Sequence, residues 1–145
     1  MALLMAKKLV NRHGTAINPT SPTLIAQVGR VLAPHGGSSF LTPDVADDPL
    51  TKRLVKGGQV WPQRVVRAPD PRANECHGVS AEMSYWNPER YRHVYGYALT
   101  DDDQMWRTHS WVHDQQDNRL IEPTPVSRNK YFGVGLTDHE SAPFY

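Results

Sequence analysis

Three residues of this chain could together form a cysteine-based catalytic group. Cys76, the only cysteine, is followed along the chain by His109 and then by Glu122. A cysteine nucleophile needs a base that takes its proton and a third group that orients the base. Cysteine, histidine and carboxylate in this order therefore predict a nucleophile, a general base and an orienting group.

Cys76 falls in a segment that predicts a helix. Asn74 can cap this helix, its first turn carries Cys76, and Asn87-Pro88 ends it. Amide groups and the dipole at a helix N-terminus stabilise a thiolate, so this placement predicts a lowered pKa for Cys76. The alternative interpretation is a buried structural cysteine, since free cysteines are among the most buried residues.

The second half of the chain predicts a three-stranded antiparallel meander, rich in β-branched and aromatic residues. On its middle strand, His109, Trp111 and His113 lie on one face because strand side chains alternate. The returning strand can bring Glu122 beside His109, where the carboxylate takes one imidazole N–H and leaves the other nitrogen for the sulfur. The strands are expected at 91–99, 104–113 and 118–122, with 130–136 as a further candidate.

The first half predicts a short lead-in over residues 1–20 and two helices. Ser21 can cap the first helix, with Pro22 at its first position and apolar residues at helical spacing up to Leu32. Asp48-Pro49 begins the second helix, which Gly57-Gly58 ends. Residues 59–67 favour extended chain, which Pro62 confines to a sheet edge or divides into two fragments.

The ordered motifs resemble the transglutaminase-like branch of the papain-like cysteine enzymes, over residues 74–124. In that family a helix-borne cysteine precedes a Gly-Tyr element, a His-Ala-Trp strand and an Asp-Pro-Thr strand end. Two positions differ, because Ser110 replaces the usual alanine and Glu122 the usual aspartate. The matching segments here are Cys76, Tyr95-Gly96-Tyr97, His109-Ser110-Trp111 and Glu122-Pro123-Thr124.

The resemblance implies an α+β fold with a papain-like/transglutaminase-like core, in which N-terminal helices pack on an antiparallel β-sheet. It implies Cys76 as nucleophile, His109 as general base and acid, and Glu122 as the orienting carboxylate. Gln63 is an oxyanion-hole candidate by residue type, beside the backbone N–H of Cys76. Residues considered for substrate binding are Trp111, Tyr97 and His77.

The implied activity is acyl transfer through a thioester on Cys76, without a cofactor, in an amide hydrolase, a protease or a transglutaminase-like transferase. The substrate would be a protein, a peptide or a small amide. The alternative, from another class, is a non-catalytic binding or inhibitor protein, for example from a phage or a bacterium, on the same fold.

Length and composition predict one domain over residues 1–145, with a helical lead-in at 1–58 and the core-like part at 59–145. With 16 Lys and Arg against 15 Asp and Glu, the net charge of +1 carries no strong nucleic-acid or membrane signal. No stretch approaches the ~20 apolar residues of a membrane span, and the first residues do not form a signal peptide. A single cysteine suits a reducing compartment, so a cytoplasmic protein is expected.

Two rival sites carry less weight. Cys76 and the histidines could ligate a metal, but no Cys-x-x-Cys or His-Glu-x-x-His pair supports this, so no metal is expected. Trp106, Trp111, Tyr95 and Tyr97 could stack nucleobases, but aromatic residues on neighbouring strands more often form cross-strand pairs in a core.

Overall fold

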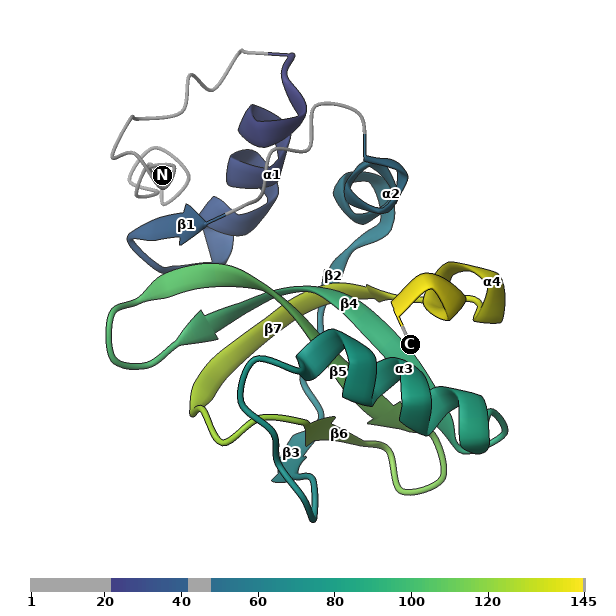
Figure 1. Ribbon diagram of the computed structural model, residues 1–145. Coiled ribbons are helices and arrows are strands. Elements are labelled where there is room, and N and C mark those ends of the chain that lie inside the picture. The colour runs from purple at the N-terminus through teal and green to yellow at the C-terminus, as the bar shows by residue number, and fades with distance from the viewer. Residues whose placement is uncertain (1–21, 42–47, 145) are drawn as a thin grey trace.

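The structure is a computed structural model that describes residues 22–41 and 48–144. In these ranges it is an α+β fold with four α-helices around a curled β-sheet (Figure 1). The helices are α1 (Leu24–Leu32), α2 (Pro49–Gly57), α3 (Cys76–Trp86) and α4 (Asp138–Ser141), with the 3-10 turns η2 (Ala33–His35) and η3 (Ala142–Phe144). The strands are β1 (Ser39–Leu41), β2 (Gln59–Val60), β3 (Arg64–Arg67), β4 (Tyr91–Thr100), β5 (Met105–Asp114), β6 (Arg119–Glu122) and β7 (Arg128–Gly135). The predicted lead-in at 1–20 lies outside the described residues.

The sheet has the order β2-β7-β4-β5-β6-β3, and β1 also pairs with β5. The antiparallel meander β4-β5-β6 and the further strand β7 are confirmed. The expectation of a purely antiparallel sheet is wrong, because β1–β5 and β3–β6 are parallel. Parallel neighbours need a long crossover, and between β3 and β6 the helix α3 and the β4–β5 hairpin provide it.

The curl of the sheet follows from the link between its two edge strands. Pro62 divides residues 59–67 as predicted, and β2 and β3 lie at opposite edges of the sheet. Six strands at about 4.8 Å spacing would separate these edges by about 24 Å in a flat sheet. Residues 61–63 can span only about 14 Å, so the sheet bends toward closure. Its inner side buries Val94, Ala98, Trp111, Leu120 and Tyr131, with Trp61 packed against them.

The outer side of the sheet is covered by the helices. One cluster lies with α1 and α2 and contains Val28, Leu32, Phe40, Leu54, Tyr97, Leu99, Trp106 and Phe132. A smaller cluster lies beneath α3 and contains Ala68, Val112 and Ile121, with Val66, Met83 and Tyr91 beside them. Side chains of β5 therefore point alternately to the inner side of the sheet and to the helices on its outer side.

Local capping explains where the first two helices begin. Thr23, not Ser21, caps α1, and its hydroxyl accepts the N–H of Ala26. Pro22 therefore precedes the cap instead of occupying the first helical position. Asp48 caps α2 as predicted, and its carboxylate accepts the N–H of Thr51 at 2.9 Å.

The helix α3 begins one residue later than its predicted cap implies. Asn74 has a φ of 63°, a left-handed conformation that asparagine tolerates but that lies outside the helix. Glu75 is the N-cap and makes no side-chain capping hydrogen bond. Cys76 is therefore the first helical residue, and the helix ends before Asn87 as predicted.

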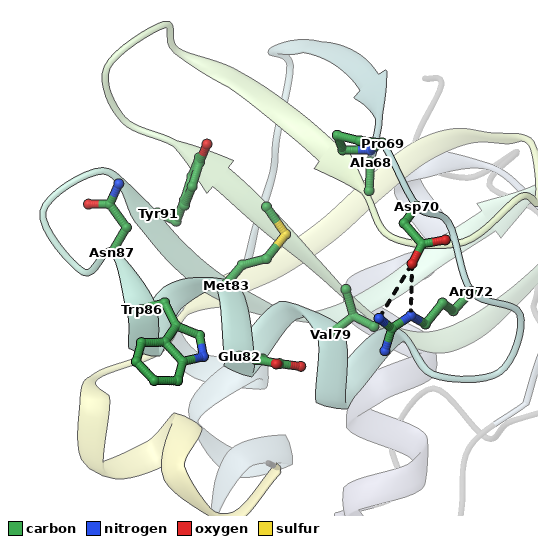
Figure 2. A pocket seen from close by; sticks show the side chains of 10 residues that line it. All are labelled: Ala68, Pro69, Asp70, Arg72, Val79, Glu82, Met83, Trp86, Asn87 and Tyr91. Atoms are coloured by element: carbon green, nitrogen blue, oxygen red, sulfur yellow. Dashed lines mark hydrogen bonds and ion pairs between the residues drawn. The ribbon is translucent and has the colours of Figure 1, made fainter.

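A groove of about 390 Å³ separates α3 from the loop that precedes it (Figure 2). Trp86 at the end of α3 is 75% exposed, and Tyr85 beside it is 55% exposed. Asp70 and Arg72 form an exposed ion pair at 3.4 Å on the loop side. The groove is lined by Ala68, Pro69, Asp70, Arg72, Val79, Glu82, Met83, Trp86, Asn87 and Tyr91.

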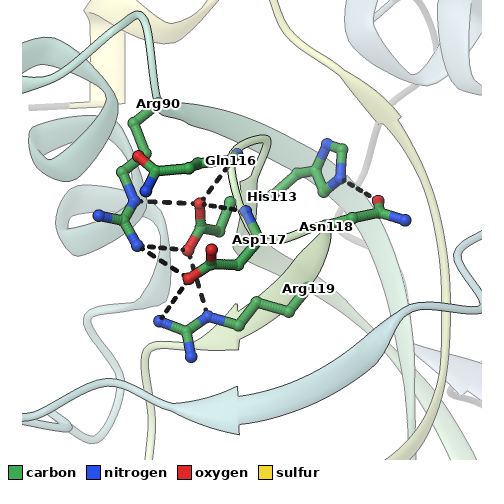
Figure 3. Close-up of polar contacts among 7 residues, drawn as sticks. Arg90, His113, Gln116, Asp117, Asn118 and Arg119 are labelled. Atoms are coloured by element: carbon green, nitrogen blue, oxygen red, sulfur yellow. Dashed lines mark hydrogen bonds and ion pairs between the residues drawn. The ribbon is translucent and has the colours of Figure 1, made fainter.

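The turn between β5 and β6 is held by the buried carboxylate of Asp114. Arg90 and Arg119 form ion pairs with it at 3.0 and 3.1 Å, and Asp117 lies in the same network (Figure 3). Its Oδ1 also accepts the backbone N–H groups of Gln116 and Asp117. Hydrogen bonds from Arg90 above all lower the pKa of Asp114 to about 2.

We expect Asp114→Asn to lower the free energy of unfolding by ~2 kcal/mol at pH 7, because it removes charge-assisted hydrogen bonds. A lowered pKa stabilises the fold fully above the unfolded value of ~3.9, and this stabilisation is lost as pH falls through about 2. Urea unfolding at pH 7 and pH 3 should therefore show the variant approaching the wild type at the lower pH. The exposed Asp102→Asn is the control, expected within ~0.5 kcal/mol of wild type. Equal stabilities at pH 7 would contradict this role of Asp114.

Candidate functional site

The predicted contact between His109 and Glu122 is present. His109 Nε2 lies 2.9 and 3.0 Å from the two carboxylate oxygens, and the residues are 1% and 2% exposed. The register of β5 and β6, with Val112 opposite Ile121, directs both side chains to the inner side of the sheet. The hairpin therefore builds a histidine–carboxylate pair in the interior.

Glu122 is held as a carboxylate by further donors. Tyr131 Oη–H donates to one oxygen at 2.8 Å, and Thr124 donates its N–H and its hydroxyl to the other at 3.0 and 2.8 Å. Arg128 Nε lies 3.3 Å away as an ion pair without hydrogen-bond geometry. Burial raises the pKa of Glu122, but hydrogen bonds from His109, Tyr131 and Thr124 outweigh burial and lower it. The carboxylate is thus ionised.

His109 is arranged as a neutral base. Burial lowers its pKa, opposed by the hydrogen bond and charge of Glu122. A neutral imidazole that donates Nε2–H to a carboxylate has its lone pair on Nδ1. Nδ1 makes no hydrogen bond to a described residue, so it is free to accept a proton.

Cys76 meets β5 at the residue next to His109. His77, the residue that follows Cys76, has its Nδ1 2.6 Å from Oγ of Ser110, and the backbone of Ser110 is among the groups that lower the pKa of the Cys76 thiol. A direct sulfur–imidazole hydrogen bond is not among the contacts of the described residues. Such catalytic contacts often tighten only when substrate binds.

The strand pairing of β5 is interrupted on one edge. One edge of β5 pairs with β4 along its length, and the other edge pairs with β1 at 105–107 and with β6 at 112–114. Among the described residues, 108–111 therefore have no strand partner on that second edge. His109 and Ser110 lie in this gap, with His109 directed inward beside Trp111, at 6.1 Å between ring centroids, and Ser110 directed toward α3. The helix α3, which begins with Cys76, and the side chain of His109 thus lie on opposite sides of β5.

The predicted lowering of the Cys76 pKa is wrong. Burial raises it, and so does the charge of Glu122, while backbone hydrogen bonds from Ser110 and His77 and the charge of Arg128 lower it less strongly. Desolvation outweighs the helix N-terminus because the sulfur is partly buried among protein groups. Cys76 is consequently a thiol at neutral pH and needs a base to become a nucleophile.

The other predicted site residues lie elsewhere. Gln63 directly precedes β3, whose Arg67 pairs with Glu122, so it lies about 13 Å along the strand from that level. Its Oε1 is buried and has no partner among the described residues. Trp111 and Tyr97 are 0% and 1% exposed, so they belong to the core and present no surface to a substrate.

Sequence patterns did not predict that Tyr131 and Arg128 belong to the site, and they did not predict the hydrogen bonds of Ser110. Tyr131 comes from β7, which is separated from β6 by β4 and β5, so only the curl of the sheet brings it to Glu122. Arg128 begins the same strand. The family resemblance marks Ser110 only as a departure from alanine. A buried serine hydroxyl needs hydrogen-bond partners, and here they are the rings of His77 and His93.

Comparison with protein-family models, curated proteins and solved structures finds no match to this chain. The resemblance to transglutaminase-like enzymes therefore stays a prediction. Within 22–41 and 48–144, no group of three or more His, Cys, Asp or Glu side chains could hold a metal ion. No helix in these ranges is long and apolar enough to cross a membrane.

Proposed function

We propose that this protein is a cysteine-dependent acyl-transfer enzyme with a papain-like, transglutaminase-like site. One observation carries the proposal. Cys76 begins α3 next to His77, whose Nδ1 lies 2.6 Å from Oγ of Ser110, and Ser110 directly follows His109, whose Nε2 is held by Glu122 and whose Nδ1 makes no hydrogen bond to a described residue. A thiol and a neutral, oriented imidazole make up a nucleophile and its base.

In the proposed reaction, His109 Nδ1 takes the proton of Cys76 while the sulfur attacks an acyl carbon of an amide or ester. The carbon–sulfur bond forms, and the bond to the leaving group breaks as His109 returns the proton to that group. Water or an amine then attacks the thioester, which restores the thiol. Glu122 stays ionised and stabilises the imidazolium that forms between the two proton transfers.

The beginning of α3 suits the negative charge that develops on the acyl oxygen. Its N-cap, Glu75, makes no side-chain capping bond, so the first-turn N–H groups have no side-chain cap. The backbone N–H of Cys76, which belongs to the same residue as the sulfur, takes the role of oxyanion donor.

The second candidate function is a non-catalytic binding protein. The exposed rings of Tyr85 and Trp86, whose centroids are 5.2 Å apart, favour it. Trp86 lines the groove of Figure 2, and both rings line a second pocket beside α3. Large exposed aromatic side chains are enriched where proteins bind partners. In that case Cys76 would be an unreactive thiol.

Acylation by p-nitrophenyl acetate tests the enzyme proposal directly. We expect release of p-nitrophenol and the mass of one acetyl group on the peptide that contains Cys76. The Cys76→Ala variant should take up no acetyl group. His109→Gln keeps a donor at the position of Nε2 but lacks Nδ1, so acylation should slow by more than about 100-fold.

His113→Gln is the matched control, because His113 lies on the same strand and bonds Asn118 through Nε2. It should acylate at the wild-type rate. A wild-type protein without acetyl-Cys76, or an equal rate in His109→Gln, would favour the binding protein instead.

A further inference from the structure

A chain of buried polar side chains runs along the side of β5 that faces α3. His77 Nδ1 lies 2.6 Å from Ser110 Oγ, which lies 2.7 Å from His93 Nε2. His93 Nδ1 then lies 2.8 Å from the hydroxyl of Ser141. Ser110 and His93 are 0% exposed and Ser141 is 4% exposed. This chain takes no part in the mechanism proposed above.

Ser110 connects this chain to the nucleophile. Its hydroxyl lies 2.6 Å from Nδ1 of His77, the residue that follows Cys76 in α3, and its backbone is among the groups that lower the pKa of the Cys76 thiol. The start of α3 is therefore attached to the residue that follows His109. We infer that Ser110 and His77 are positioning residues, which hold the Cys76 sulfur in the gap beside His109. This inference rests on the proposed function.

The hydroxyl suits its two imidazole neighbours. It has one hydrogen, so it donates to one ring nitrogen and accepts from the other. An alanine, which stands here in the family that the sequence resembles, would leave His77 Nδ1 and His93 Nε2 buried without a partner. The serine at position 110, in place of alanine, thus supplies the hydrogen-bond partner that both histidines need.

The C-terminal segment shields this chain from water. The ring of Phe144 lies 5.3 Å from the rings of both His77 and His93, and it stacks on Tyr95 at 5.9 Å. Burial lowers the pKa of His77 to about 4 and that of His93 to about 3. Both rings are neutral near pH 7, so hydrogen-bond geometry and not charge holds the start of α3.

Two substitutions of His77 distinguish the role of its Nδ1 from that of its Nε2. Asparagine places an amide atom near the position of Nδ1 and can keep the bond to Ser110. Glutamine places its amide near Nε2 and cannot keep that bond in the same geometry. Both variants lose the ring contact with Phe144, so a role in packing alone would affect them equally.

The measurement is the rate of Cys76 acetylation by p-nitrophenyl acetate, with thermal unfolding of each variant beside it. We expect His77→Asn to stay within about 3-fold of wild type and His77→Gln to be at least about 10-fold slower, since a small misplacement of a nucleophile costs this much or more. Equal rates in the two variants, or a faster His77→Gln, would overturn the inference. The exposed His139→Gln is the control.

A second pair of variants tests Ser110 itself. Ser110→Thr keeps the hydroxyl, so it should acylate faster than Ser110→Ala, and the reverse order would also overturn the inference. If the Ser110→Thr or the Ser110→Ala protein does not fold, the comparison of His77→Asn with His77→Gln alone tests the inference. Failure of the proposed function has a different signature, because wild-type Cys76 would then not be acetylated, or His109→Gln would be as fast as wild type.

Discussion

Replacing Glu122 by glutamine should slow Cys76 acylation by about 1,000-fold. The amide removes the charge that stabilises protonated His109 and permits the wrong imidazole tautomer. It also turns an NH₂ group toward donors, because Tyr131 donates to one carboxylate oxygen and Thr124 to the other. Arg128 loses its buried counter-charge. We therefore expect the free energy of unfolding to fall by ~3–5 kcal/mol at pH 7.

The pH dependence of stability tests whether the charge of Glu122 causes this loss of unfolding free energy. The pKa of Glu122 is lowered, so its contribution is complete above the unfolded value of ~4.3 and is lost as pH falls through the folded value. The difference between wild type and Glu122→Gln should shrink below about pH 4 in urea unfolding. Glu82→Gln, on the exposed side of α3, should match wild type in rate and stability. An unchanged acylation rate in Glu122→Gln would remove the carboxylate from the mechanism.

Replacing Gly96 by alanine should prevent stable folding, with a loss of at least ~4 kcal/mol. Gly96 lies opposite His109 on β5 and opposite Gly133 on β7. An added Cβ would collide with the carbonyl oxygen of Phe132 and lie 2.5 Å from the Cα of Gly133. These are backbone atoms of a paired central strand, so they cannot move aside as a flexible side chain would.

Urea unfolding and near-UV circular dichroism would measure this loss. Gly57→Ala is the matched control, because a Cβ on Gly57 meets no atom within 4 Å. Gly57 is the last residue of α2, where alanine favours helix, so the control should be as stable as wild type or slightly more. A well-folded Gly96→Ala protein would mean that β4 and β7 can separate without loss of the sheet.

The local elements could be predicted because each has a short-range cause. The Asp48 carboxylate and Pro49 begin α2, Pro62 divides the extended segment, and Asn87-Pro88 ends α3. Residues 91–122 alternate and turn as a meander does, which was enough to place Glu122 beside His109. Such contacts join neighbouring strands of one hairpin, so periodicity and turn length determine them.

Long-range features of the fold were beyond these patterns. The parallel strands β1 and β3 are three and four residues long and carry little periodic signal. The gap in β5 between its pairings with β1 and β6 could therefore not be predicted. The bond between Tyr131 and Glu122 crosses the inside of the curl. Gln63 was an oxyanion-hole candidate by residue type alone. The register of β3 with β6 places it away from the level of Glu122.

Sequence by itself determined the candidate group of Cys76, His109 and Glu122, because residue type and order along the chain express their chemistry. Tertiary structure decided the electrostatic state of each member. Burial makes Cys76 a thiol and His109 a neutral base, while four hydrogen-bond donors keep Glu122 ionised. A pKa depends on desolvation and on neighbours distant in sequence, and only the folded chain supplies both.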